Sequence, residues 1–598
     1  MIPLSIWRRV LCLVAALALG AGQQVFAQAP DAGFVNGNGT VAFVNVNTVT
    51  MADDRVRPDQ VVVVRGGRIT SIGARGRIPV PEDARVIDGA GRYLVPGLTD
   101  AHVHLDGDGT RVGTSRADFG DGPLYLAYGV TSVINMRGLP VHLEWRRRIE
   151  RGDLVGPTIY TAGEFVNEPR VNTPDEVQRE LETQVRAGYD LVKFRQVYSR
   201  ETGYLTTEGL SRQAYVRMND VARELGIPLT GHAPVNLGLD ALLEARQPLA
   251  HLGELSHVYF LPMLGNLHWL AITAVAFVML TLISVTTGLA TVRNRWRVLP
   301  PAPRAVSRVR ELAGLQLLAA AIASACAISF LPGGPYSASG TLRVVFTAML
   351  LLVAAATTAI VFATVTIWSE HETTGAARVQ AAVASVAGIA LAWVALAFWV
   401  PVVWRSTPRG IDHVAAMVRD AGISVQTTLV AYDAVGGPGR RALAADPVLD
   451  FMHPEVQVRW RRLRTPAPRL RYTDFMKALA GSLHRAGVLL VAGTDAMGYP
   501  LVAPGASLHR ELELLVESGL APVDALRAAT RAPAAFLQRP LEFGRIAPGA
   551  RADLLLVNGN PLENVGRLRD LEGVMVRGLW YPRHELALML QGLASDSE

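Results

Sequence analysis

Two histidines separated by one residue, His102 and His104, end an apolar segment that follows Pro96 and Gly97. Side chains two residues apart on a β-strand point to the same face, so both imidazoles would lie side by side. Neutral imidazoles are common ligands of transition-metal ions, and a pair of them supplies half of such a site. A His-x-His pair also occurs by chance on strand surfaces, so a metal site requires further ligands elsewhere in the chain.

Further candidate ligands follow short apolar segments later in the sequence. Lys193 and Lys477 are the only lysines among the 58 basic residues, so a lysine inside an apolar segment calls for a specific role. Taken singly, a histidine at a strand end is more often a hydrogen-bonded loop residue, and a Gly-Thr-Asp sequence is often a turn. The later candidates are Lys193, His232, His251 and Asp495.

Eight short apolar strands alternate with stretches of helical periodicity and would position these residues. This repeated alternation predicts a parallel (β/α)8 TIM barrel of the α/β class. Reactive groups in such barrels sit at the carboxyl ends of the strands, where all six candidates fall, so we expect them to meet at one rim. The first predicted strand lies within residues 95–106 and ends at His104, and the others lie at residues 129–134, 158–160, 191–194, 228–232, 248–251, 423–429 and 488–495.

Both ends of the chain carry β-strand patterns. Residues 40–95 and 549–578 alternate apolar and polar side chains between turn signals, as strands with one buried face do. We expect the two pieces to build one β-sandwich beside the barrel. The predicted domains are a signal peptide at 1–29, the two sandwich parts at 30–95 and 541–598, the two barrel parts at 96–262 and 406–540, and an insertion at 263–405.

With these residues identified, the chain resembles the metal-dependent amidohydrolase superfamily, nearest its imidazolonepropionase-like and prolidase-like branch. The matching segments follow the order of that family and cover nearly all of residues 40–262 and 405–585. They are residues 96–104, 192–194, 231–233, 251–254, 493–495, 505–512 and 549–554.

The resemblance implies a binuclear site with two divalent ions, Zn²⁺ being the expected metal, bridged by a carbamate formed from a lysine and CO2. It implies hydrolysis of an amide C–N bond, in a peptide, an N-acyl amino acid or a cyclic amide, by a hydroxide that bridges the metals. Asp495 would be the catalytic general base and then acid. The implied ligands are His102, His104 and Asp495 for one ion, His232 and His251 for the other, and carboxylated Lys193 between them.

Other functions remain open on the sequence. A deaminase or lactonase could use the same scaffold, and a receptor or transporter subunit could bind a ligand without catalysis, although it would need neither Lys193 nor Asp495. The net charge of +6 is carried by scattered arginines, which argues against a nucleic-acid partner. The partner that the resemblance implies is a small-molecule amide. The two cysteines, Cys12 and Cys326, exclude a disulfide framework.

Residues 267–404 contain four uncharged apolar stretches, each long enough to cross a bilayer. Tryptophans lie near their ends, as interfacial aromatic residues do. Six arginines within 293–310 place that connection in the cytoplasm by the positive-inside rule. Together with the signal peptide, this predicts a multi-pass membrane protein with an extracytoplasmic catalytic domain, periplasmic in a Gram-negative bacterium. The predicted spans are about 268–292, 312–332, 344–368 and 380–404.

The insertion begins after His251 and therefore occupies the sixth strand-to-helix loop, beside the predicted active-site mouth. This position suggests that the helices hold the mouth near membrane lipid, so that the substrate is amphiphilic. A plain anchor combined with a soluble substrate is an equally good interpretation.

Overall fold

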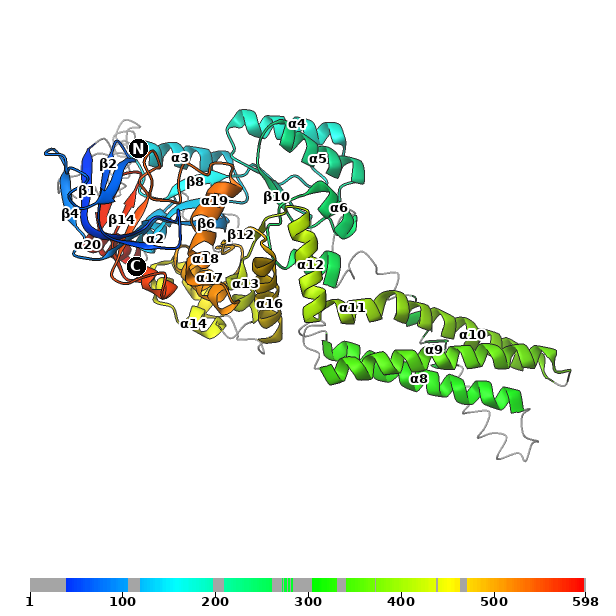
Figure 1. Ribbon diagram of the computed structural model, residues 1–598. Coiled ribbons are helices and arrows are strands. Elements are labelled where there is room, and N and C mark those ends of the chain that lie inside the picture. Colours follow the sequence, from blue (N-terminus) through cyan, green and yellow to red (C-terminus); the bar gives the residue numbers. More distant parts are fainter. Residues whose placement is uncertain are drawn as a thin grey trace, which may run out of the picture.

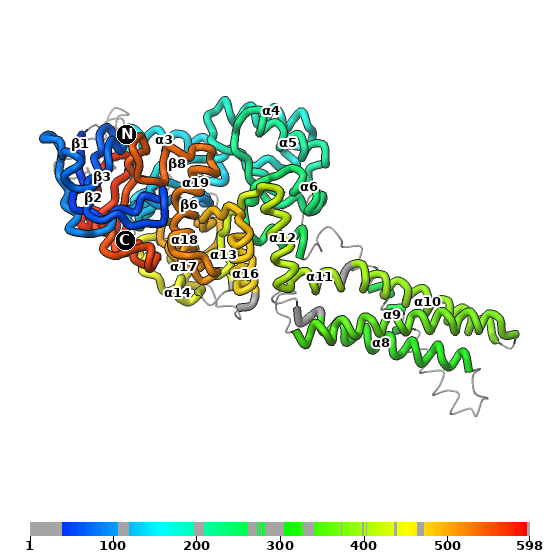
Figure 2. Tube along the Cα trace, viewed as in Figure 1, coloured from blue at the N-terminus to red at the C-terminus, as the bar shows by residue number. Residues whose placement is uncertain are grey.

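The computed structural model describes residues 39–105, 119–196, 209–260, 304–330, 340–371, 373–436, 439–462 and 470–595, with a few positions between 272 and 282. These residues form a β-sheet domain, a barrel and a long helical bundle (Figure 1). The backbone trace shows the bundle projecting from the barrel beside α12, which spans Pro408–Asp420 (Figure 2). The predicted signal peptide lies outside the described residues.

Eight strand positions close into a parallel barrel. The strands β6 to β8 pair in order, as do β9 with β10 and β11 with β12. Isolated parallel β-bridges between the remaining neighbours complete the ring. The sixth strand position consists of Leu249 alone, which bridges to Gly231 on one side and to Val425 on the other. The predicted TIM barrel is confirmed. Its strands are β6 (Leu98–Val103), β7 (Val130–Asn135), β8 (Thr158–Thr161), β9 (Val192–Phe194), β10 (Leu229–Gly231), β11 (Val425–Gln426) and β12 (Leu490–Val491).

Helices between the strands cover the outside of the barrel, and α4 (Pro174–Ala187) shows how the sequence specifies them. Thr173 caps its first turn by accepting from the N–H of Glu176, whose side chain reaches back to the N–H of Thr173, and Gly188 ends it at a φ of 88°. The others in the barrel include α2 (Gly122–Ala127), α3 (Pro140–Arg151), α5 (Arg212–Glu224), α6 (Gly238–Ala245), α16 (Leu470–Ala486), α17 (Ala506–Glu517), α18 (Pro522–Ala528) and α19 (Arg531–Phe536).

One eight-stranded sheet joins the two ends of the chain. Its strand order is β15-β14-β13-β5-β1-β2-β3, with β4 paired to β1. The two halves meet where β5 pairs antiparallel with β13, for example at Leu94 and Leu556. The strands are β1 (Thr40–Val49), β2 (Val56–Arg65), β3 (Arg68–Ala74), β4 (Arg85–Asp88), β5 (Tyr93–Pro96), β13 (Leu554–Val557), β14 (Leu571–Val576) and β15 (Leu579–Pro582).

This sheet is curled, which refines the expected sandwich. The rings of Phe43 on β1 and Trp580 on β15 lie 5.3 Å apart, although three strands separate β1 from β15 in the hydrogen-bonded order. In a flat sheet these strands would be about 19 Å apart, because neighbouring strands are spaced by about 4.8 Å. The two termini therefore build one continuous sheet folded over a shared core, where we had expected two separate sheets.

The insertion folds into long, roughly antiparallel helices. They are α8 (Arg304–Phe330), α9 (Gly340–Ser369), α10 (Gly375–Val394), the π-helical turn η3 (Ala395–Trp399) and α11 (Val400–Arg405). Among the described residues, two helical segments are long and apolar enough to cross a membrane, Gly340–Ser369 and Gly375–Ala397. They coincide with the third and fourth predicted spans. Most of the first predicted span lies outside the described residues, so a four-span bundle stays a prediction.

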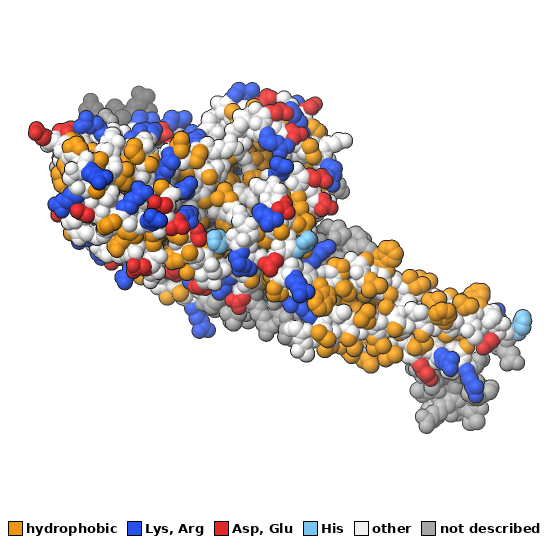
Figure 3. Space-filling view, viewed as in Figure 1, with side chains coloured by type: hydrophobic (Ala, Val, Ile, Leu, Met, Phe, Trp, Pro, Cys, Tyr) orange, Lys and Arg blue, Asp and Glu red, His pale blue; other side chains and the backbone are white. Residues whose placement is uncertain are grey.

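Apolar side chains cover the outside of the bundle, and a few polar side chains are buried inside it among apolar ones. Gln316 of α8 is buried and donates to Thr357 Oγ1 of α9 at 2.7 Å, and Thr357 in turn donates to the carbonyl of Gly388 on α10 at 3.1 Å. By contrast, Phe362 is 70% exposed and Trp393 63% exposed. Figure 3 shows the apolar side chains spread over the surface of the bundle. A water-soluble helical bundle would instead carry mainly polar side chains on its outer face.

Candidate active site

Three side chains from the first and eighth strands meet at the carboxyl-terminal rim of the barrel. His102 lies in β6, His104 follows it, and Asp495 follows β12. Asp495 Oδ1 is 3.0 Å from His104 Nε2 and 3.6 Å from His102 Nε2. One ligand atom from each residue lies within 4.8 Å of the others, and all three side chains are buried. Two imidazole nitrogens and a carboxylate oxygen at this spacing fit a divalent ion such as Zn²⁺.

The histidines of the fifth and sixth strands lie beside these three residues. The ring centroids of His251 and His102 are 4.3 Å apart, and those of His251 and His232 are 5.2 Å apart. His251 Nδ1 is also 3.9 Å from Asp495 Oδ2. The structure therefore brings the four predicted histidines and Asp495 to one end of the barrel.

Lys193 occupies the middle of β9, opposite Thr230 of β10, and is only 1% exposed. Its Nζ has no hydrogen-bond partner within the described residues. Burial lowers the pKa of the Lys193 amine to about 7, against the opposing effect of the Asp495 and Glu254 charges. About half of the amines are thus neutral at pH 7, and a neutral amine can add to CO2. Carboxylation would convert this buried amine into an anionic oxygen ligand.

His102 is held in one tautomer by Gln426 of β11. Gln426 Nε2 donates to the carbonyl of Ala101 at 2.8 Å, which fixes the orientation of the amide. Its Oε1 can only accept and lies 2.9 Å from His102 Nδ1, so Nδ1 carries the proton and Nε2 keeps its lone pair. Burial and the Lys193 charge lower the pKa of His102 well below its usual value. The neutral ring therefore presents Nε2 toward Asp495, as a metal ligand would.

Asp100 joins the first and eighth strands behind the metal-site cluster, by which we mean His102, His104, Lys193, His232, His251 and Asp495. Asp100 is fully buried. Its carboxylate accepts from Thr494 N at 3.0 Å, from Thr494 Oγ1 at 2.6 Å and from His102 N at 3.3 Å. Burial raises the pKa of Asp100 to about 7. These hydrogen bonds fix β6 against the segment that carries Asp495.

Glycines permit the close approach of these strand ends. A Cβ on Gly493 would lie 2.6 Å from His102 Cβ, and a Cβ on Gly498 would lie 2.3 Å from Asp495 Oδ1. Asp495 itself has a φ of 61°, a left-handed conformation that is uncommon for residues with a side chain. The Gly-Thr-Asp sequence is therefore a turn as well as a ligand segment, and the turn aims the carboxylate at the histidines.

Glu254 supports the second pair of histidines. Its Oε2 accepts from Ala233 N at 2.8 Å, and its Oε1 lies 3.6 Å from His232 Nδ1. Burial raises the pKa of Glu254 above its ordinary value. Our reading of the sequence gave no role to Glu254, Asp100 or Gln426. Asp100 could have been found, because it precedes His102 by the same two-residue spacing that separates His102 from His104. Glu254 could have been found too, because it ends the matching segment at residues 251–254.

The end of β11 supplies no predicted ligand, but it contacts two of the ligands. Gln426 meets His102, and Thr428 Oγ1 lies 3.2 Å from His251 Nδ1. Between them, Thr427 donates its hydroxyl to Glu511 of α17, and Glu511 Oε2 also accepts from Val430 N at 2.7 Å.

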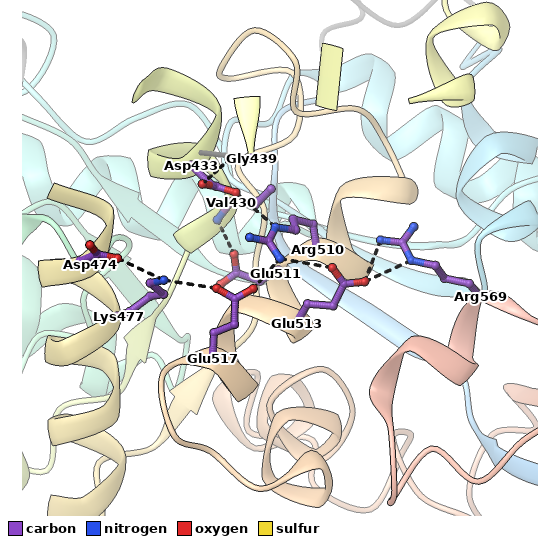
Figure 4. Close-up of polar contacts among 10 residues, drawn as sticks. All are labelled: Val430, Asp433, Gly439, Asp474, Lys477, Arg510, Glu511, Glu513, Glu517 and Arg569. Atoms are coloured by element: carbon purple, nitrogen blue, oxygen red, sulfur yellow. Dashed lines mark hydrogen bonds and ion pairs between the residues drawn. The ribbon is translucent and has the colours of Figure 1, made fainter. Parts of the chain in front are cut away.

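Ion pairs around Glu511 hold α17 against the helices beside it (Figure 4). Arg510 Nε lies 3.2 Å from Asp433 Oδ2 on α13 (Leu429–Gly436), and Arg510 Nη1 lies 2.7 Å from Glu517 Oε1. Lys477 of α16 lies 3.3 Å from Glu517 Oε2. These partly exposed contacts join α13, α16 and α17 on the outside of the barrel.

Comparison with known proteins agrees with this architecture. Residues 451–581, which include Asp495, match the amidohydrolase family, so this part of the chain carries an amidohydrolase-family domain. The imidazolonepropionase of Idiomarina loihiensis is 41% identical over 70 residues, 11% of this chain and 17% of that protein. The adenine deaminase of Rubrobacter xylanophilus is 33% identical over 103 residues, 17% of each chain. The chain thus matches less than a fifth of the length of these relatives.

A solved structure matches over much more of the chain. A Xaa-Pro dipeptidase with methionine bound in its active site aligns with a TM-score of 0.51 and 14% identity, over 91% of this chain and 100% of that one. Similarity at this level of identity establishes the fold. The barrel and its flanking sheet therefore share the fold of that dipeptidase.

Proposed function

We propose that this protein is a membrane-anchored, binuclear metal-dependent amidohydrolase that hydrolyses an amide C–N bond. The observation that carries the proposal is the meeting of the six residues of the metal-site cluster at one barrel rim from five separate strands. Two of its polar atoms, His102 Nε2 and Lys193 Nζ, are buried without a hydrogen-bond partner within the described residues. Buried polar atoms of this kind are costly unless a ligand satisfies them.

The residues fit two divalent ions of the Zn²⁺ type. His102, His104 and Asp495 would hold one ion and His232 and His251 the other, with carboxylated Lys193 between them. Ions held there would polarise the scissile carbonyl and lower the pKa of the attacking water.

Asp495 is placed to act as the proton carrier. Its carboxylate lies among three histidine rings from two strands and is nearly inaccessible to solvent. It would accept a proton from the attacking water and release it to the leaving nitrogen, so that the amine departs neutral. Gln426 and Asp100 would keep the ring of His102 and the backbone near Asp495 in place during this transfer.

The site is tested by two variants and a matched control. Replacing Lys193 by Ala should remove about half of the bound metal and most of the turnover, whereas replacing Lys477, the other lysine, should change neither. Replacing Asp495 by Asn should lower kcat roughly a thousandfold. Metal is measured by elemental analysis of the purified protein and turnover on a panel of dipeptides, N-acyl amino acids and cyclic amides. Full metal content and activity in Lys193→Ala would contradict the proposal.

A deaminase on the same scaffold is the second candidate, favoured by the segment that resembles an adenine deaminase. It would also cleave a C–N bond, but with release of ammonia from an amino-substituted ring. Assaying ammonia from adenine and related bases beside the amide panel distinguishes the two. A ligand-binding subunit without catalysis would show binding and no turnover in either assay.

The membrane anchor is supported by the apolar outer face of the bundle. Between residues 344 and 368 α9 carries no charged side chain, and many of its apolar side chains face outward. Exposed apolar area of this size is unfavourable in water but is satisfied by lipid, while hydrogen bonds between Gln316, Thr357 and Gly388 join the helices inside. We infer four spans, with the barrel on the extracytoplasmic side. Reporter fusions at the carboxyl terminus and within residues 293–303 should report opposite sides of the membrane.

A further inference from the structure

The helical bundle joins the barrel directly beside the metal-site cluster. The π-helical turn η1 (Ser256–Phe260) begins five residues after His251 and two residues after Glu254. Because Glu254 lies 3.6 Å from His232, the same short segment contacts the cluster at one end and the bundle at the other. At a helical rise of about 1.5 Å per residue, the eight residues from His251 to Tyr259 span roughly 12 Å.

The junction is a packed contact. Arg405, the last residue of α11, donates from Nη1 to the carbonyl of Tyr259 at 3.1 Å, and its guanidinium lies 5.1 Å from the centre of the Tyr259 ring. The ring of Phe260 lies 4.9 Å from that of Phe475 on α16 of the barrel. The foot of the bundle is thereby fixed to the rim of the barrel.

The same foot carries the residues that mark a membrane surface. Trp404 is 46% exposed and donates from Nε1 to Thr347 Oγ1 at 3.2 Å, and Arg405 follows it. At the far end of α9 stand Trp368 and, beyond it, Glu370. The uncharged residues 344–368 between them span about 37 Å as a helix, which is enough for a hydrocarbon core of about 30 Å. The bilayer surface would therefore fall at Trp404, beside Tyr259 and the active-site rim.

From this geometry we propose that the substrates are long-chain acyl amides that reach the site from the bilayer. The acyl chain would stay among lipids at the foot of the bundle while the amide enters the rim. Water adds to the carbonyl and the C–N bond breaks, which gives a fatty carboxylate and an amine that takes up the released proton. This inference rests on the proposed amidohydrolase function and adds the source of the substrate.

The test compares N-palmitoyl and N-acetyl amides of the same amino acids, using the full-length protein in phosphatidylcholine vesicles. At equal bulk concentration, we expect the palmitoyl amides to be hydrolysed at least about tenfold faster, since the bilayer concentrates them where the site opens. A site that opens only to water gives the reverse order, because lipid withholds the palmitoyl amide, and that order would overturn the inference while leaving the hydrolase intact. Failure to hydrolyse either class would overturn the inference, and the proposed hydrolase would fall with it only if the dipeptides and cyclic amides are not hydrolysed either.

A pair of arginine variants tests the junction separately. Arg405→Ala removes the contact with Tyr259 and should lower palmitoyl-amide hydrolysis several-fold while acetyl-amide hydrolysis changes less than twofold. Arg378→Ala is the matched control, because Arg378 bonds the Glu370 carbonyl at the opposite end of the bundle. Equal loss of both activities in Arg405→Ala would mean that the junction is only structural and would count against the bilayer route.

Discussion

Glu511 of α17 holds Thr427 at the end of the seventh strand. Thr427 lies between Gln426 and Thr428, whose side chains contact metal-site histidines. The Glu511 carboxylate accepts from the Thr427 hydroxyl, while Gln426 and Thr428 on either side reach His102 and His251. One buried carboxylate on α17 therefore positions rings that belong to both proposed metal positions.

Replacing Glu511 by Gln should lower kcat about 10- to 100-fold with little change in KM, because an amide cannot accept from both Thr427 and Val430 without turning a donor toward one of them. Activity and metal affinity are measured together, the latter by competition with a chelator. Glu517→Gln on the same helix is the control, since Glu517 is partly exposed and pairs only with Lys477 and Arg510. Equal effects of the two changes would contradict a positioning role.

Replacing Gln426 by Met should weaken metal binding about 10- to 100-fold, because His102 loses the acceptor that keeps the proton on Nδ1. Methionine has a similar length and no amide, so the packing of the barrel changes little. The apparent dissociation constant for Zn²⁺ is measured by chelator competition. An unchanged dissociation constant in Gln426→Met would contradict this role for Gln426.

The lowered pKa of Lys193 predicts how carboxylation depends on pH. With a pKa of about 7, the neutral fraction of the amine rises about tenfold from pH 6 to pH 8 and then levels off. An ordinary lysine would instead show a rise of about a hundredfold over the same range. At a fixed concentration of dissolved CO2 and with Zn²⁺ present, the rate at which metal-free protein regains activity should follow the first curve. A rate still rising tenfold per unit above pH 8 would contradict the buried, neutral amine.

His509 predicts a loss of stability in acid. Its Nε2 donates to the Tyr128 carbonyl at 2.9 Å, and burial lowers its pKa to about 3 from an ordinary value of 6.5. The folded state therefore binds fewer protons than the unfolded state between these values, so stability is present above pH 6.5 and is lost as the pH falls toward 3, by about 1.4 kcal/mol per unit. His509→Gln keeps a donor and does not titrate, so its Tm should fall less between pH 7 and pH 5.

Two glycines of the bundle form a matched pair. A Cβ on Gly388 would lie 2.7 Å from Gln316 Nε2, whereas a Cβ on Gly314 would meet nothing within 4 Å. Gly388→Ala should therefore lower the Tm of the detergent-solubilised protein, because the hydrogen-bonded Gln316 has to move. Gly314→Ala should leave it unchanged or raise it, since alanine favours a helix by about 1 kcal/mol. The opposite order would mean that the helices do not pack as described.

Much of the barrel could be predicted from the sequence, because its strands are short apolar segments bounded by turns and its ligands stand at their ends. The supporting contacts could not. Gln426 lies 324 residues from His102 in the chain, and nothing in the local pattern around β11 indicates that contact. The pairing of β5 with β13 is also a long-range event, so the alternation of apolar residues predicted strands without revealing that they form one curled sheet.

His251 and Asp495 approach within 3.9 Å, yet the entire insertion separates them along the chain. For the proposed membrane insertion, both ends must therefore emerge on the same face of the bilayer, which requires an even number of crossings. Any change that added or removed a single crossing would strand one half of the metal site on each side, and no rearrangement of the soluble domain could rejoin them.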